Sequence, residues 1–122
     1  MGHADFQLGE YAGMKLYERV IETVCKWGNE ENLMFVVGAT RAEMVGEIRK
    51  MIPDHFLLVP GVGAQGGSLV DITKAAANEE VGLLINSSRG ILYASGGEDY
   101  AEAASTEAKK LAEEMGRFIP GV

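Results

Sequence analysis

Three short runs of almost entirely apolar residues constrain the fold of this chain more than any other feature. They cover residues 33–37, 56–59 and 81–85. A run without polar alternation indicates a strand that is buried on both faces, as strands in parallel sheets usually are. All three runs are far too short to span a bilayer.

Segments in which apolar residues recur at helical spacing separate the three runs. The pattern predicts helices over residues 15–27, from Thr40 to Ile52, over 68–77 and over 99–117, with one further turn near 91–94. Thr40 with Glu43 predicts a capping box, and Ser68 predicts an N-cap. In the last helix, the expected buried stripe is Ala101, Ala104, Ala108, Leu111 and Met115.

This alternation of helices and strands predicts an α/β fold with parallel strands joined by right-handed crossovers. No linker or low-complexity tract interrupts the sequence, so we expect residues 1–122 to form a single domain. Three parallel strands are few, and the edges of such a sheet would be apolar and unprotected. The sequence therefore predicts a piece of a larger sheet, or a unit that associates with another chain.

Composition excludes several classes of protein. The 122 residues carry 18 acidic against 11 basic side chains, and the net charge of −7 argues against binding to nucleic acid or to an anionic membrane. Cys25 is the only cysteine, which rules out an internal disulfide and fits a reducing cytoplasm. Residues 1–3 do not begin a signal peptide. His3 and His55 lack ligand spacing, so no metal site is expected.

Residues 61–66 match the pattern G-x-G-x-x-G between a strand and a helix. Such glycines let the backbone approach an anion, as in dinucleotide-binding folds. That fold also requires an acidic residue about 20 positions further on, at the end of the next strand. This sequence has Asn86 and Arg89 there instead, which disfavours the dinucleotide interpretation. A glycine-rich turn without a ligand remains an alternative.

Arg89 suggests a different anion. Loops at the carboxyl ends of neighbouring barrel strands converge on one face, and barrel enzymes often bind phosphate there. A guanidinium group offers phosphate two parallel charged hydrogen bonds. Gly61, Gly63 and Gly66 with the Ser88–Arg89 pair therefore predict a phosphate site, with a surface salt bridge of Arg89 as the alternative.

Residues 58–67, followed by residues 85–89, closely resemble the orotidine 5'-monophosphate decarboxylases of the longer bacterial group. Residues 36–40 and 4–7 also resemble that family, so the resemblance runs from about residue 4 to residue 119. It implies a partial TIM (β/α)8 barrel whose three strands are the sixth to the eighth. The implied reaction converts orotidine monophosphate to uridine monophosphate and CO2 without a metal or cofactor.

By the same resemblance, Gln65 belongs to a loop that closes over phosphate and pyrimidine, while Arg89 and the glycine loop hold the phosphate. The family's Asp-x-Lys-x-x-Asp motif is absent from this sequence, so no catalytic residue is expected here. We therefore expect the C-terminal part of the enzyme, inactive alone, which associates with itself or with the missing N-terminal part. Two alternatives remain. One is a non-catalytic half-barrel that works by assembly, and the other is another phosphate-using barrel enzyme such as a sugar-phosphate isomerase.

Overall fold

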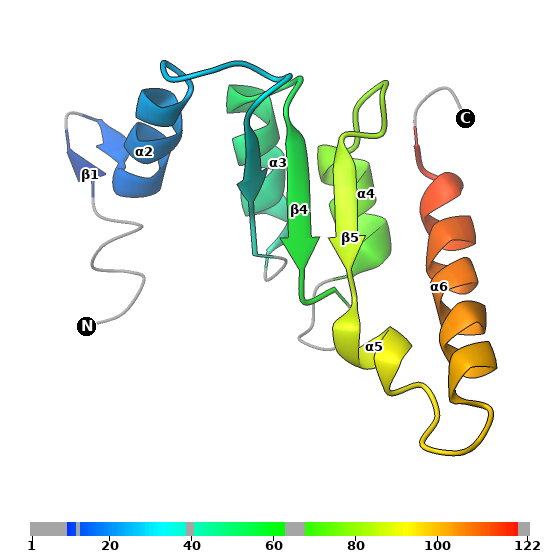
Figure 1. Ribbon diagram of the computed structural model, residues 1–122. Coiled ribbons are helices and arrows are strands. Elements are labelled where there is room, and N and C mark those ends of the chain that lie inside the picture. Colours follow the sequence, from blue (N-terminus) through cyan, green and yellow to red (C-terminus); the bar gives the residue numbers. More distant parts are fainter. Residues whose placement is uncertain (1–9, 12, 39–40, 63–67, 120–122) are drawn as a thin grey trace. The chain divides into compact units, whose positions relative to one another are not determined.

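A computed structural model describes residues 10, 11, 13–38, 41–62 and 68–119 of the chain (Figure 1). The chain divides into two compact units, Met1–Leu33 and Met34–Val122. The expectation of a single domain remains a prediction. Among the described residues, no helix is both long enough and apolar enough to cross a membrane.

The first unit contains a short hairpin and one helix. Strands β1 (Glu10–Tyr11) and β2 (Met14–Lys15) pair antiparallel, and helix α2 (Leu16–Val24) follows directly. The helix was predicted, although it ends earlier than expected. The hairpin was not predicted, because two residues per strand are too few to show an alternating pattern. The Glu18 carboxylate accepts a hydrogen bond from the Lys15 backbone N–H at 2.8 Å and so caps the start of α2.

The second unit is built on a three-stranded parallel sheet, which confirms the predicted strands. Strands β3 (Met34–Val36), β4 (Phe56–Pro60) and β5 (Leu83–Asn86) lie in the order β3-β4-β5. Strand β5 begins two residues later than predicted. Val81 and Gly82 precede it with positive φ angles of 74° and 67°, which are incompatible with an extended strand.

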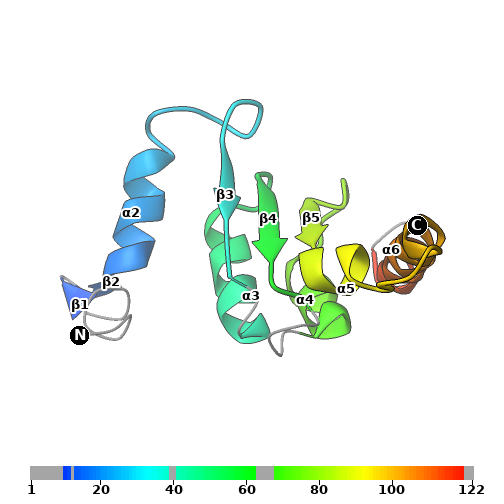
Figure 2. The same cartoon turned by 60° about the horizontal axis from the view of Figure 1, so that its bottom comes forward.

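Helices α3 (Ala42–Met51) and α4 (Leu69–Ala76) both lie on one face of this sheet (Figure 2). The core lies between them and that face. Its fully or almost fully buried side chains are Val45, Ile48, Ile52, Leu57, Val59, Val62, Leu69, Ile72, Ala76 and Leu83. The alternation of buried residues along β4, with Leu57 and Val59 inside, shows which face of the sheet the helices cover.

The two predicted helix caps had different outcomes. The Ser68 hydroxyl accepts a hydrogen bond from the Asp71 N–H at 3.3 Å, so this N-cap is confirmed. The capping box of α3 is wrong, because Arg41, in an extended conformation, is the N-cap residue and makes no side-chain cap bond. The third helical position is then Met44, which has no carboxylate. Thr40 lies outside the described residues.

Helices α5 (Ser88–Leu92) and α6 (Tyr100–Gly116) complete the unit, and α6 agrees closely with its predicted range. The predicted buried stripe of α6 is wrong, because no residue of this helix is buried and Ala101 and Ala108 are exposed. Helix α6 contacts α4 and α5. Just after α6, the Phe118 ring lies 4.7 Å from the Lys74 ammonium group of α4.

A single buried arginine joins the elements at the amino edge of the sheet. The Arg49 side chain of α3 is 7% exposed. Its guanidinium donates hydrogen bonds to five backbone carbonyls at 2.6–3.2 Å. The acceptors are Ile52, Pro53, His55, Ala76 and Gly82. They lie at the ends of α3 and α4 and before the starts of β4 and β5. Burial lowers the pKa of Arg49, and the nearby Asp54 carboxylate acts against this shift.

Candidate functional site

The exit loops of β4 and β5 meet at the carboxyl edge of the sheet. Pro60 and Asn86, the last residues of the two strands, are paired in the sheet register. Beyond them, the buried Ser87 hydroxyl donates a hydrogen bond to the Val62 carbonyl at 3.2 Å. These contacts confirm the expectation that the two loops lie on the same face.

Gly61 makes the first turn of the loop that leaves β4. Its φ is +80°, a left-handed conformation that side chains other than glycine rarely adopt. No atom would lie within 4 Å of a Cβ at this position, so the backbone conformation alone requires glycine. Gly63, Gln65 and Gly66 lie outside the described residues, and their predicted roles remain predictions.

Ser88 and Arg89 form the first turn of α5, directly after β5. Both side chains are exposed, and the Ser88 hydroxyl donates a hydrogen bond to the Asn86 side-chain oxygen at 3.0 Å. Within the described part of the chain, Arg89 makes no salt bridge. The structure thus brings Gly61, Ser88 and Arg89 to one edge of the sheet, on two loops joined by a buried hydrogen bond.

Ser87 is the residue of this edge that sequence reasoning missed. It continues the two-residue alternation of Leu83 and Ile85, and so lies on the helix-covered side of the sheet, whereas Ser88 lies in solvent. A Cβ at Gly90 would lie 2.8 Å from the Ser87 Oγ, so glycine at position 90 keeps space for this hydroxyl. The strand alternation was the signal that distinguishes the two serines.

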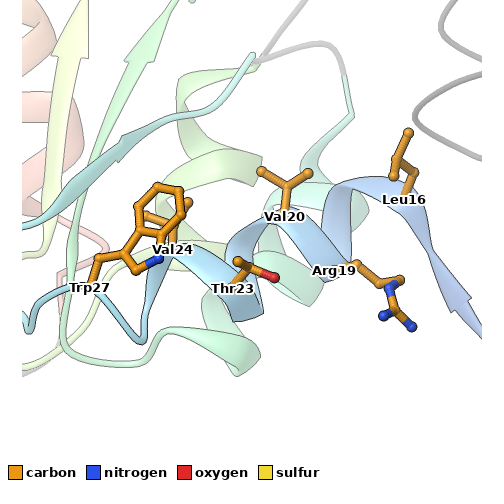
Figure 3. Close-up of a pocket in the computed structure, with 6 residues that line it drawn as sticks. All are labelled: Leu16, Arg19, Val20, Thr23, Val24 and Trp27. Atoms are coloured by element: carbon orange, nitrogen blue, oxygen red, sulfur yellow. The ribbon is translucent and has the colours of Figure 1, made fainter.

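No other described residues suggest a catalytic or metal site. The described part of the chain has no cluster of three or more histidine, cysteine or acidic side chains that could hold a metal ion. A pocket of about 330 Å³ lies along helix α2 in the first unit (Figure 3). Its lining residues are Leu16, Arg19, Val20, Thr23, Val24 and Trp27. The lining is mainly apolar and offers no acid–base pair, so we do not regard this pocket as an active site.

No known family profile matches the chain, but individual proteins do. Over 118 residues it is 53% identical to the orotidine 5'-phosphate decarboxylase of Flavobacterium johnsoniae, covering 97% of this chain and 43% of that protein. It is 47% identical over 122 residues to the enzyme of the same name from Bacteroides fragilis, covering 99% of this chain and 44% of that enzyme. The chain thus spans less than half the length of these relatives.

Solved structures give the same match. The Leishmania donovani OMP decarboxylase superposes with a TM-score of 0.75 at 31% identity, covering 93% of this chain and 44% of that one. The Leishmania donovani UMP synthase gives a TM-score of 0.76 at 34% identity, covering 93% of this chain and 25% of that one. The three parallel strands and their flanking helices are therefore part of a (β/α)8 barrel. Over nearly its whole length, this chain is a homologue of one part of the orotidine 5'-phosphate decarboxylases.

Proposed function

We propose that this chain is the C-terminal, phosphate-binding part of an orotidine 5'-phosphate decarboxylase, the enzyme that forms uridine monophosphate and CO2. Its strands β3, β4 and β5 would be the sixth to the eighth of the barrel. The observation that carries the proposal is the Ser87–Val62 hydrogen bond, which joins the glycine loop to the segment that bears Arg89. Phosphate sites of barrel enzymes are frequently built from two consecutive loops of this kind.

Each part of this edge would have a distinct role. The Arg89 guanidinium is exposed and would form a two-pronged, charged contact with the phosphate. The backbone N–H groups of the loop that begins at Gly61 would complete the site, with Ser88 at its border. Gln65 would lie between phosphate and pyrimidine. The ligand would thus be a pyrimidine nucleoside monophosphate, and no metal or cofactor would take part.

The proposed role is binding rather than bond cleavage. Contacts to a remote phosphate accelerate a reaction by supplying binding energy that is used at the reacting carbon. They do not replace the Asp-x-Lys-x-x-Asp array, which this sequence lacks. We therefore propose that the chain by itself does not decarboxylate orotidine 5'-phosphate.

Calorimetric titration of inorganic phosphate and uridine monophosphate into the chain tests the binding site. A hydrogen bond to a charged group contributes roughly 1.5–3 kcal/mol. Arg89→Ala should therefore lower the affinity for both ligands about tenfold or more. Arg89→Lys should recover only part of the affinity, because an ammonium group cannot bind in the same two-pronged way. Gln65→Ala should lower the affinity for uridine monophosphate more than the affinity for inorganic phosphate.

The matched control is Arg117→Ala, which removes another exposed arginine, at the end of α6. It should leave both affinities unchanged. Equal affinities in the parent and in Arg89→Ala would show that Arg89 is only a surface charge, and the phosphate-site proposal would then fail.

A further inference from the structure

Ser87, which lies between β5 and α5 in the chain, is bonded to two different segments (Figure 1). Its hydroxyl donates a hydrogen bond to the Val62 carbonyl at 3.2 Å, which we call the loop-joining bond. Its backbone carbonyl accepts a hydrogen bond from the Ile91 N–H of α5 at 3.0 Å. Ser87 and Val62 are 8% and 1% exposed, so water competes little for the loop-joining bond. One buried residue thus connects the loop that begins at Gly61 to the helix that carries Arg89.

The Ser87 hydroxyl is not used in the way that is usual for its position. Ser87 is the N-cap residue of α5, where a serine hydroxyl ordinarily accepts a hydrogen bond from a backbone N–H of the first helical turn. Here the side chain makes no such cap bond. The hydroxyl instead joins two segments that are 25 residues apart in the sequence. This choice of partner favours a role in the spacing of the two loops over a role in starting the helix.

Gly90 provides the space that this arrangement requires. A Cβ at position 90 would lie 2.8 Å from the Ser87 Oγ, which is closer than a Cβ atom approaches another side chain in a relaxed structure. Gly90 lies within α5 and does not have a positive φ, so its backbone conformation does not require glycine. Glycine is also less favourable than alanine in a helix. The contact with the Ser87 hydroxyl is therefore the reason that the structure offers for glycine here.

We infer that Ser87 is a positioning residue for phosphate binding, and that Gly90 keeps its hydroxyl in place. This inference deepens the proposed function and rests on it. A phosphate held by both the glycine loop and Arg89 requires a fixed distance between the two segments, because hydrogen bonds weaken steeply when their geometry changes. The loop-joining bond fixes that distance before the ligand arrives, which reduces the entropy that binding must remove.

Calorimetric titration of inorganic phosphate and uridine monophosphate into the chain tests this role. Ser87→Ala should lower both affinities by the same factor, about threefold to tenfold, which corresponds to the loss of one neutral hydrogen bond. Gly90→Ala should cause a similar loss, because the new Cβ displaces the Ser87 hydroxyl from the Val62 carbonyl. The double variant should bind no more weakly than either single variant, since both changes remove the same bond.

Stability measurements separate a positioning role from a merely structural one. Alanine at position 90 favours helix α5 while it breaks the loop-joining bond, so Gly90→Ala should unfold at nearly the same urea concentration as the parent. Circular dichroism should show the parent's helix content in every variant. The matched control is Thr73→Val, which removes another buried hydroxyl, one that donates to the Leu69 carbonyl within α4 at 2.7 Å. This control should leave both affinities unchanged.

The same titrations distinguish failure of this inference from failure of the proposed function. If Arg89→Ala lowers the affinities but Ser87→Ala and Gly90→Ala do not, the inference is wrong and the phosphate site stands. Losses that add together in the double variant would also overturn the inference, because the two residues would then act separately. If the parent binds neither ligand, or if Arg89→Ala leaves both affinities unchanged, the proposed function fails and this inference fails with it.

Discussion

The two edges of the sheet are held together in different ways. At the amino edge, the buried Arg49 guanidinium makes five hydrogen bonds to carbonyls of segments that enter β4 and β5. At the carboxyl edge, the Ser87–Val62 bond joins the two exit loops, and Arg89 and Ser88 lie in solvent. In barrel enzymes, residues at the amino face contribute to stability, and residues at the carboxyl face bind ligands. The comparison indicates that this chain divides its polar groups in the same way.

The largest expected effect is the loss of the amino-edge network. Arg49→Ala should lower the free energy of unfolding by about 3–5 kcal/mol, because several buried carbonyls would lose their donor. Arg49→Lys should recover part of this loss, since one ammonium group has fewer donors than the guanidinium fork. Urea denaturation followed by circular dichroism measures the difference.

Lys50→Ala is the control for Arg49, because Lys50 is the next residue of α3 and is exposed. Its unfolding free energy should stay within about 0.5 kcal/mol of the parent. A loss below about 1 kcal/mol in Arg49→Ala would show that water or a rearranged loop replaces the guanidinium, and the contrast between the edges would disappear.

A smaller effect is expected at the carboxyl edge. Ser87→Ala removes the donor to the buried Val62 carbonyl and should cost about 1–2 kcal/mol. Ser88→Ala removes an exposed hydroxyl one residue further on and should change the unfolding free energy by less than about 0.5 kcal/mol. Equal effects of the two changes, measured by the same denaturation, would mean that Ser87 does not join the loops.

The smallest expected effect is a gain in stability at the amino edge. Val81 has a φ of 74°, an unfavourable conformation for a β-branched residue, and its N–H and carbonyl both pair with Asn78. Asparagine tolerates this conformation better, so Val81→Asn should stabilise the chain by up to about 1 kcal/mol. Val70→Asn, at another half-buried valine in helix α4, should instead destabilise it. Losses of similar size at both positions would show that Val81 carries no strain.

Much of the fold could be predicted from the sequence because its signals are local. The apolar runs predicted β3, β4 and β5, and helical spacing predicted α2, α3, α4 and α6. The boundaries shifted where the backbone departs from these patterns, as at Val81 and Arg41. At the candidate site, the sequence predicted roles for Gly61 and Arg89 because glycine and arginine have distinctive chemistry, and these roles stay predictions. Ser87 was missed: strand alternation places it on the covered side of the sheet, but its bond to the Val62 carbonyl depends on a contact between two segments.

By itself, the sequence determined that this chain forms a parallel α/β unit with an apolar sheet, because side-chain periodicity reports local conformation and burial. Only the tertiary structure decided the role of Arg49, whose acceptors extend as far as Gly82, 33 residues away. It also decided which face of the sheet helices α3 and α4 of the second unit cover. The apolar runs predicted burial on both faces. Such a run indicates that both faces of a strand must be buried. Which segments bury them depends on tertiary contacts, and no local pattern specifies those.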